Sequence, residues 1–160
     1  MAALDALPFG MGVGLAALAG LLLGSFLATL VLRWPLGRSV LRGRSHCDAC
    51  GTALTARDLI PLLSAIAARG RCRHCGAPID ALHWRVELLS AAIGAAALAL
   101  MPGTAGWLWA LFGWLLLPLA LLDARHMWLP DPLNVVLALA GLLLAGPLLE
   151  VSLLDRWIGA

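Results

Sequence analysis

The sequence has little charge. Charged residues make up 12% of the 160-residue chain, about half the share found in soluble domains, while 62% are apolar and the mean hydropathy is +0.94. A soluble monomer is excluded because too few polar side chains remain to cover its surface. Intrinsic disorder is excluded because it requires low hydrophobicity and high net charge, and the formal net charge is only +2. The class that remains is an integral membrane protein.

Lysine is absent, and all eleven basic residues are arginine. The chain is also rich in alanine, leucine and glycine. We therefore attribute the missing lysine to a biased genome composition rather than to a need for guanidinium chemistry.

Charge is missing altogether from two long stretches. No charged residue lies between Asp5 and Arg33, which leaves room for a membrane helix over residues 9–32, since a span needs about 20 apolar residues. No basic residue precedes this run, and the run is too long for the core of a signal peptide, so we expect a retained anchor. The second stretch, residues 88–122, contains the turn dipeptide Pro102-Gly103 and predicts a helical hairpin with arms at 83–101 and 105–122.

A fourth span, residues 132–149, follows a helix-start signal. Asp131 stands where an N-cap belongs and Pro132 where the first helical residue belongs. The predicted fold is an all-α integral membrane protein with about four transmembrane helices and a small zinc-ribbon-like loop. Its parts are residues 1–32 (the first transmembrane helix), 33–82 (a cytoplasmic four-cysteine loop) and 83–160 (further transmembrane helices). No internal repeat is expected beyond the apolar runs.

Arginine is distributed unevenly. Nine of the eleven arginines lie between residues 33 and 85, so the positive-inside rule places the loop after the first predicted span in the cytoplasm and the N-terminus outside. Tryptophan prefers membrane interfaces, and six of the seven tryptophans agree with this topology, whereas Trp114 is expected in the middle of a span. The inner set is Trp34, Trp84 and Trp128, and the outer set is Trp107, Trp109 and Trp157.

All four cysteines occur in two Cys-x-x-Cys-Gly pairs separated by 21 residues. The pairs are Cys47 with Cys50 and Cys72 with Cys75. Two intervening residues let one tight turn present both thiolates to a single ion, and four thiolates complete the shell of a structural Zn²⁺. Disulfides or free thiols are the alternative, but a cytoplasmic loop disfavours disulfides. His46 and His74 are interpreted as bystanders, and the positive-inside rule already explains the arginines without nucleic acid.

Several carboxylates are candidates for function. Asp123 lies at the expected end of the third span, where desolvation makes a carboxylate a functional candidate, although a solvated helix end beside Arg125 explains it equally well. Asp131 is assigned to capping. Glu87 is expected to pair with His83 one helical turn away. Asp155, near the C-terminus, is expected to be solvated.

Several segments in the same order resemble the bacterial type IV prepilin peptidases, a family of leader peptidase/N-methyltransferase enzymes. The matching segments are Gly24-Ser25-Phe26-Leu27, the two cysteine pairs, Ile60-Pro61-Leu62-Leu63-Ser64, Val86-Glu87-Leu88-Leu89 and Leu129-Pro130-Asp131. The resemblance covers most of the chain and corresponds to the N-terminal part of the family. It implies an aspartic endopeptidase of the bacterial inner membrane that cleaves type IV prepilin-like or pseudopilin leader peptides. N-methylation of the new N-terminus with S-adenosylmethionine is the family's second activity.

The resemblance also implies a role for Asp123. It stands seven residues before the proline of Leu-Pro-Asp, the position of one of the family's two catalytic aspartates. The second lies in a Gly-x-Gly-Asp motif that these 160 residues do not contain. Two carboxylates must share the acid and base roles, so a C-terminal catalytic half appears absent, and the second carboxylate is expected from such a half or from a homo-oligomer.

Three functions remain open at this stage. The first is a prepilin leader peptidase that contributes the zinc loop and Asp123. The second is a truncated, catalytically inactive relative that acts as a zinc-stabilised membrane binding module. The third is a membrane-tethered zinc ribbon that senses metal or binds nucleic acid, which the Leu-Pro-Asp segment disfavours.

Overall fold

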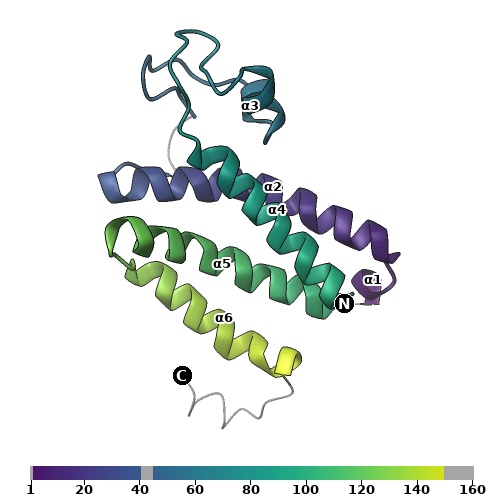
Figure 1. Ribbon diagram of the computed structural model, residues 1–160. Helices are drawn as coiled ribbons and strands as arrows, with labels where there is room; N and C mark the ends of the chain where they lie inside the picture. Colours follow the sequence, from purple (N-terminus) through teal and green to yellow (C-terminus); the bar gives the residue numbers. More distant parts are fainter. Residues whose placement is uncertain (1, 41–44, 150–160) are drawn as a thin grey trace.

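The computed structural model describes residues 2–40 and 45–149. Within these residues every regular element is a helix, apart from two isolated β-bridges in the cysteine loop. Four long helices form one elongated layer, and the cysteine loop stands above it (Figure 1). The elements are α1 (Ala2–Asp5), α2 (Phe9–Arg33), η1 (Trp34–Leu36), η2 (Ala56–Leu59), α3 (Leu63–Ala67), α4 (Leu82–Leu100), α5 (Thr104–His126) and α6 (Asp131–Leu149).

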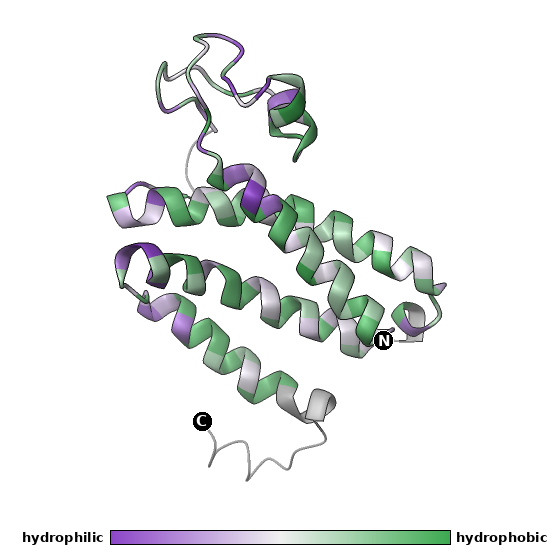
Figure 2. Ribbon diagram, in the orientation of Figure 1, coloured by the Kyte–Doolittle hydropathy of each residue, from purple (hydrophilic) through white to green (hydrophobic). Residues whose placement is uncertain are grey.

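Two segments of the described chain are long and apolar enough to cross a membrane. They are Phe9–Leu36, which joins α2 to η1, and Thr104–His126, which is α5. The predicted first span and hairpin therefore coincide with helices, whereas a four-span arrangement is not established. The first two turns of α4 contain His83, Arg85 and Glu87, which lower its mean hydropathy. Apolar residues cover the long helices and polar residues gather at their ends and in the loop (Figure 2).

Small residues bring α2 and α4 into close contact. Gly12, Ala16, Gly20, Gly24 and Ala28 recur every four residues along α2 and are all buried. A Cβ at Gly20 would overlap the carbonyl of Ser90, and one at Gly24 would lie 2.7 Å from the Cα of Glu87. Small residues at four-residue spacing are a common basis of helix packing in membranes, where backbones must approach to gain van der Waals contact.

The hairpin continues further than its hydropathy predicts. Helix α5 ends at His126, so Asp123 lies in its last turn rather than beyond it. No proline or glycine interrupts the chain between Pro118 and Pro130, and the basic residues of this last turn favour the negative helix end. The helix stops at Met127, whose φ is 49° and whose N–H donates to the Asp123 carbonyl at 2.8 Å.

The prediction that Asp131 is the N-cap of α6 is wrong, because the helix begins one residue earlier than predicted. The carbonyl of Pro130 accepts the N–H groups of Leu133 (3.0 Å) and Asn134 (3.2 Å), so Pro130 occupies the N-cap position. Asp131 is the first residue of α6, where its negative charge still favours the positive helix end. Aspartate is a common N-cap and proline a common first helical residue, and this pattern predicted the later start.

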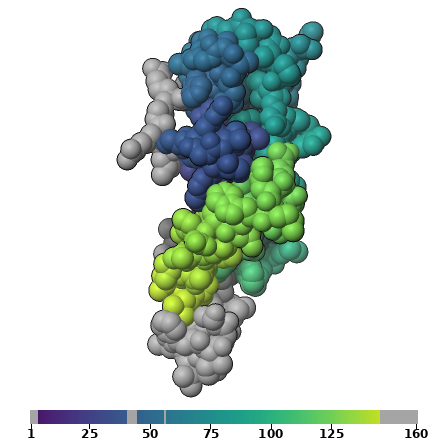
Figure 3. All heavy atoms as spheres, turned by 90° about the vertical axis from the view of Figure 1, so that its left-hand side faces the viewer, coloured from purple at the N-terminus to yellow at the C-terminus, as the bar shows by residue number. Residues whose placement is uncertain are grey.

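One end of the helix layer is held together by aromatic contacts. The rings of Trp34, just after α2, and Trp128, between α5 and α6, meet edge to face with centroids 5.9 Å apart. From this side, the dark blue end of α2 lies against the green end of α5 (Figure 3). The contact fixes the α5–α6 connection, and hence the end of the helix that bears Asp123, against the segment that leads into the cysteine loop.

At the other end, Asp5 caps a helix 99 residues away in sequence. Its carboxylate accepts the N–H of Thr104 at 2.7 Å and the hydroxyl of the same residue at 2.8 Å. A Cβ at Gly103, the residue before Thr104, would lie 2.5 Å from the Asp5 carboxylate, and its φ of 81° also favours glycine. The hydrogen bonds from Thr104 hold the pKa of Asp5 below its ordinary value.

This lowered pKa predicts a pH-dependent contribution to stability. We expect Asp5→Ala to lower the thermal unfolding midpoint at neutral pH. The wild-type advantage is fully present above the unfolded-state pKa of about 3.9 and is lost as the pH falls through the lower folded-state pKa. Thermal unfolding of detergent-solubilised protein between pH 7 and pH 2 measures it. The matched control is Asp5→Asn, which keeps an acceptor but does not titrate. A wild-type advantage over Asp5→Ala that stays constant over this range would contradict the assignment.

Candidate functional site

The two cysteine pairs fold into equivalent turns. In each turn the first cysteine accepts the N–H of the following glycine, from Gly51 to Cys47 at 2.8 Å and from Gly76 to Cys72 at 2.9 Å. The φ angles of these glycines are 69° and 73°, the left-handed conformation that glycine adopts without strain. The two turns therefore share one backbone pattern, although the residues between their cysteines differ.

The equivalence extends beyond the glycines. The N–H of Cys47 donates to the Thr52 carbonyl, and that of Cys72 donates to the Ala77 carbonyl. A flanking antiparallel bridge closes each turn, and the bridges join His46 to Ala53 and Arg71 to Pro78. Each turn therefore presents its two sulfurs in a similar way, and the fold of the loop brings the two turns face to face.

All four sulfur atoms converge on one point. The Sγ atoms of Cys47, Cys50, Cys72 and Cys75 lie within 4.8 Å of one another, and Cys47 and Cys75 are 3.9 Å apart. A tetrahedral Zn²⁺ with bonds of 2.3 Å to sulfur requires sulfur–sulfur distances of about 3.8 Å. The four cysteines therefore fit a zinc ion with small adjustments. Within the described chain this group contains neither of the adjacent histidines.

Backbone N–H groups and neighbouring thiols shape the electrostatics of the cluster. The Thr52 hydroxyl, 3.3 Å from the Cys50 sulfur, and the Thr52 N–H lower the pKa of Cys50 to about 6. The Ala77 N–H lowers the pKa of Cys75, but partial desolvation and the adjacent thiols outweigh it and raise that pKa to about 11. These opposite shifts arise because the four sulfurs lie close together, so that ionisation of one thiol disfavours ionisation of its neighbours.

Ion pairs and caps hold the two turns together. Asp48 lies 3.7 Å from the guanidinium of Arg33 at the end of α2 and 3.4 Å from that of Arg38. Asp58 lies 3.4 Å from Arg73 and accepts the N–H and hydroxyl of Thr55 in a capping box. The hydrogen bonds from Thr55 hold the pKa of Asp58 below its ordinary value. The first cysteine turn is thus tied to the end of α2, and the second turn is tied to η2.

Glu87 attaches the loop to α4 in a way the sequence did not predict. Its side chain is 6% exposed, and Oε2 accepts the N–H of Leu62 at 2.8 Å. The described residues contain no ion pair between Glu87 and His83 at contact distance, although the Glu87 carboxylate still attracts the His83 side chain electrostatically. Leu62 has a φ of 58°, so this contact holds an unusual backbone conformation in place just before α3. Leu62 and Glu87 both lie in segments that carry the family resemblance. That resemblance was the feature of the sequence that could have marked these two positions as important.

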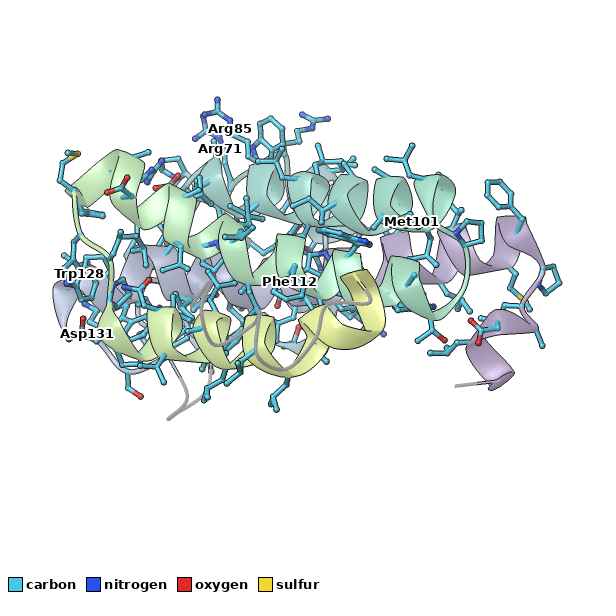
Figure 4. All side chains as sticks on the ribbon, turned by 90° about the horizontal axis from the view of Figure 1, so that it is seen from below. Arg71, Arg85, Met101, Phe112, Trp128 and Asp131 are labelled. Atoms are coloured by element: carbon cyan, nitrogen blue, oxygen red, sulfur yellow. The ribbon has the colours of Figure 1, made fainter. Side chains whose placement is uncertain are left out.

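Asp123 is exposed at the end of α5. Within residues 2–40 and 45–149 its side chain has no recorded ion pair or hydrogen bond, so its oxygens are available to a substrate or to another carboxylate. Figure 4 shows Trp128 and Asp131 at one end of the helix layer, with Met101 far along toward the other. The structure brings the four cysteines together, but among the residues it describes no second carboxylate is found in contact with Asp123. Glu150, Asp155 and Trp157 lie outside the described residues.

Comparisons with known proteins agree on one family. A family model described as the Bacterial Peptidase A24 N-terminal domain matches residues 18–101. The chain is 41% identical over 146 residues to the "Prepilin leader peptidase/N-methyltransferase" of Myxococcus xanthus, covering 88% of this chain and 42% of the relative. The proteins of the same name from Burkholderia pseudomallei and Bacillus subtilis are 38% and 34% identical, covering 89% and 86% of this chain and 54% of each relative.

The alignments cover most of this chain but a smaller share of each relative. The chain spans about half the length of the curated relatives it matches. No solved structure matches it. The cysteine turns and the contact between α2 and α4 fall inside the matched model, whereas Asp123 lies beyond residue 101 within the longer alignments.

Proposed function

The chain belongs to the bacterial prepilin leader peptidase family, and from this premise we propose that it supplies the zinc-binding unit and one catalytic aspartate of a leader peptidase. The substrates are type IV prepilins or pseudopilins, cleaved after their leader peptides. The observation that carries the proposal is Asp123, an exposed carboxylate in the last turn of α5, seven residues before the proline of Leu-Pro-Asp.

The proposed chemistry follows from the two roles a carboxylate can play. In aspartic proteolysis one carboxylate takes a proton from the attacking water while the other donates a proton to the scissile carbonyl. Asp123 can hold a proton on either oxygen, because neither is engaged within the described chain. One carboxylate cannot perform both roles at once, so the second comes from the segment of the full family protein that contains Gly-x-Gly-Asp, or from a second copy of the chain.

We assign zinc a structural role. Four thiolates from Cys47, Cys50, Cys72 and Cys75 complete a tetrahedral shell and leave no open position for a substrate. Bound zinc supplies folding free energy to a loop that contains few regular elements. Through Arg33 and Glu87, this rigid unit is held against the ends of α2 and α4.

We propose methyl transfer to the new N-terminus as a second activity, because the relatives are named N-methyltransferases. The methyl donor, S-adenosylmethionine, supplies an activated methyl group when bound.

The proposed membrane topology has four spans, an external N-terminus and a cytoplasmic cysteine loop in the bacterial inner membrane. It rests on the clustering of nine arginines between residues 33 and 85, from the last residue of α2 to the first turn of α4. We expect a reporter fused after Ser64 to show cytoplasmic activity in cells, and one fused after Gly103 to show periplasmic activity. Periplasmic activity of the Ser64 fusion would overturn both the topology and the reducing environment assumed for the thiolates.

The competing proposal is an inactive binding module that docks substrates through the zinc unit. The exposed and unengaged Asp123 favours the peptidase instead, since a docking role makes no use of it. Leader cleavage by the chain assembled with the C-terminal segment of a relative separates the two, and Asp123→Asn is the diagnostic variant.

A further inference from the structure

The cysteine loop exposes apolar side chains along one short segment, from η2 to α3. Leu59, Ile60, Leu63 and Ile66 are all exposed, and the two on α3, Leu63 and Ile66, are 63% and 71% accessible. We call these four residues the α3 patch. Figure 2 shows α3 as mostly hydrophobic. Clustered apolar side chains on a surface mark contact with a partner or with a membrane.

The position of the α3 patch is set by its contact with α4. Glu87 lies about one helical turn after Trp84, and its Oε2 accepts the N–H of Leu62, the residue before α3, at 2.8 Å. Tryptophan prefers the membrane interface, so in the proposed topology Trp84 lies at the lipid headgroups and Glu87 about 4.5 Å deeper, at a helical rise of about 1.5 Å per residue. Leu88 and Leu89, the next residues of α4, are exposed and face lipid in that topology. Helix α3 is therefore held beside a lipid-facing surface, and Figure 1 shows it bent back toward the helix layer.

The backbone around the patch is suited to apolar surroundings. Where water is scarce, a backbone N–H needs a partner within the protein. Carbonyls two to five residues earlier accept the N–H groups of Leu63, Ser64, Ile66, Ala68 and Gly70. The N–H of Leu62 donates instead to Glu87, a carboxylate that is itself buried. A loop in water does not need a buried carboxylate for such a contact, whereas a segment at the boundary of the acyl chains does.

Basic residues lie on both sides of the patch. Arg57 precedes it and Arg69 follows it; both are exposed, and neither forms an ion pair within the described part of the chain. The adjacent acid, Asp58, is already paired with Arg73, and the sequence contains no further carboxylate before Asp80. An apolar face between available cations is typical of segments that insert apolar side chains into a bilayer and hold their arginines at the lipid phosphates.

We propose that the α3 patch inserts into the cytoplasmic leaflet of an anionic bilayer. Leu63 and Ile66 lie among the upper parts of the acyl chains, and Arg57 and Arg69 contact the phosphates. The inference rests on the proposed topology, in which α4 spans the membrane, and it requires neither leader cleavage nor methyl transfer. The bilayer then holds the cysteine loop in addition to the contacts with α2 and α4, so the loop lies on the membrane surface instead of standing free in the cytoplasm.

A photo-crosslinking residue tests this position. The residue p-benzoylphenylalanine is introduced in place of Ile66, and the zinc-loaded chain is reconstituted in phosphatidylglycerol nanodiscs and illuminated. Mass spectrometry with fragmentation identifies lipid adducts and separates attachment to acyl chains from attachment to headgroups. Leu89 on α4 is the positive control, and Ala49, exposed at the tip of the first cysteine turn, is the negative control.

We expect acyl-chain adducts at Ile66 with a yield similar to that at Leu89, and a several-fold lower yield at Ala49. Leu63 provides a second position on the same face. Preparations are compared only when their zinc content equals that of the wild type, which shows that the loop has folded.

Lipid charge tests the role of the arginines. In nanodiscs of phosphatidylcholine alone, the adduct yield at Ile66 should fall several-fold while that at Leu89 stays unchanged, because only the patch depends on attraction to anionic phosphates. Arg57→Gln combined with Arg69→Gln should cause the same loss in phosphatidylglycerol.

Three results would overturn the proposal: no acyl-chain adducts at Leu63 and Ile66 when Leu89 forms them, equal yields at Ala49 and Ile66, or a yield at Ile66 that does not depend on lipid charge. Crosslinks to protein in place of lipid at Ile66 would also overturn it and assign the patch to another polypeptide. Absence of lipid adducts at Leu89 would overturn the topology together with the inference. Leader cleavage that survives these results leaves the proposed peptidase function standing, because Asp123 lies on α5 and not in the patch.

Discussion

Replacing Asp123 with asparagine is expected to abolish leader cleavage in an assembled peptidase. The substitution keeps the size and hydrogen-bonding shape of the side chain but removes the group that exchanges a proton. General acid–base catalysis contributes about 10²–10⁴-fold to a rate, so the loss should be at least about 10²-fold. Because Asp123 is exposed and unengaged in the described chain, the variant should fold and insert like the wild type. Cleavage is measured by mass spectrometry of the N-terminus of a prepilin substrate.

Asp131→Asn is the matched control. Asp131 lies eight positions after Asp123 and begins α6, where a carboxylate favours the helix end but is not required for it. We expect a loss of only a few-fold, well short of that at Asp123. Equal loss at both positions would show that Asp131 takes part in the chemistry, and full activity of Asp123→Asn would remove Asp123 from the mechanism.

Loss of a zinc ligand should have the second large effect. Cys50→Ser removes one of four converging sulfurs, and we expect zinc content to fall from one equivalent to below half an equivalent. The cysteine loop should then become sensitive to limited proteolysis, because a structural zinc site supplies the folding free energy of its loop. The helices should persist, since the contact between α2 and α4 does not involve the cysteines. Elemental analysis and proteolysis measure the two effects.

His74→Ala is the control for the zinc prediction. His74 lies between the two cysteines of the second turn but outside the sulfur cluster. We expect it to keep one equivalent of zinc. Zinc loss in His74→Ala equal to that in Cys50→Ser would mean that a histidine replaces one of the assigned thiolates.

The sequence predicts the helices and the cysteine cluster because both depend on local patterns. The charge-free runs identify α2 and the hairpin, and the Cys-x-x-Cys-Gly spacing already defines how each turn presents its sulfurs. Helix ends are less certain, because they depend on single capping contacts. Helix α5 continues through Asp123 to His126, and α6 begins at Asp131 rather than at Pro132.

Contacts between distant residues could not be predicted from one sequence. Hydropathy identifies a helix as apolar, but it does not identify the neighbouring helix against which that helix packs. The four-residue spacing of glycine and alanine on α2 offered a signal for a close contact, without identifying α4 as the partner. The bonds from Asp5 to Thr104 and from Glu87 to Leu62 join residues 99 and 25 positions apart. Glu87 was assigned to His83 because a neighbour on the same helix is the partner that sequence spacing suggests.

The most direct measurement is leader cleavage by this chain with and without the C-terminal segment of a relative that contains Gly-x-Gly-Asp. The two pieces are co-expressed in membranes, and a prepilin substrate is analysed by mass spectrometry for its new N-terminus. The account predicts no enzymatic cleavage by the 160-residue chain alone, cleavage when both pieces are present, and loss of that cleavage with Asp123→Asn. Cleavage that needs neither the added segment nor Asp123 would contradict it.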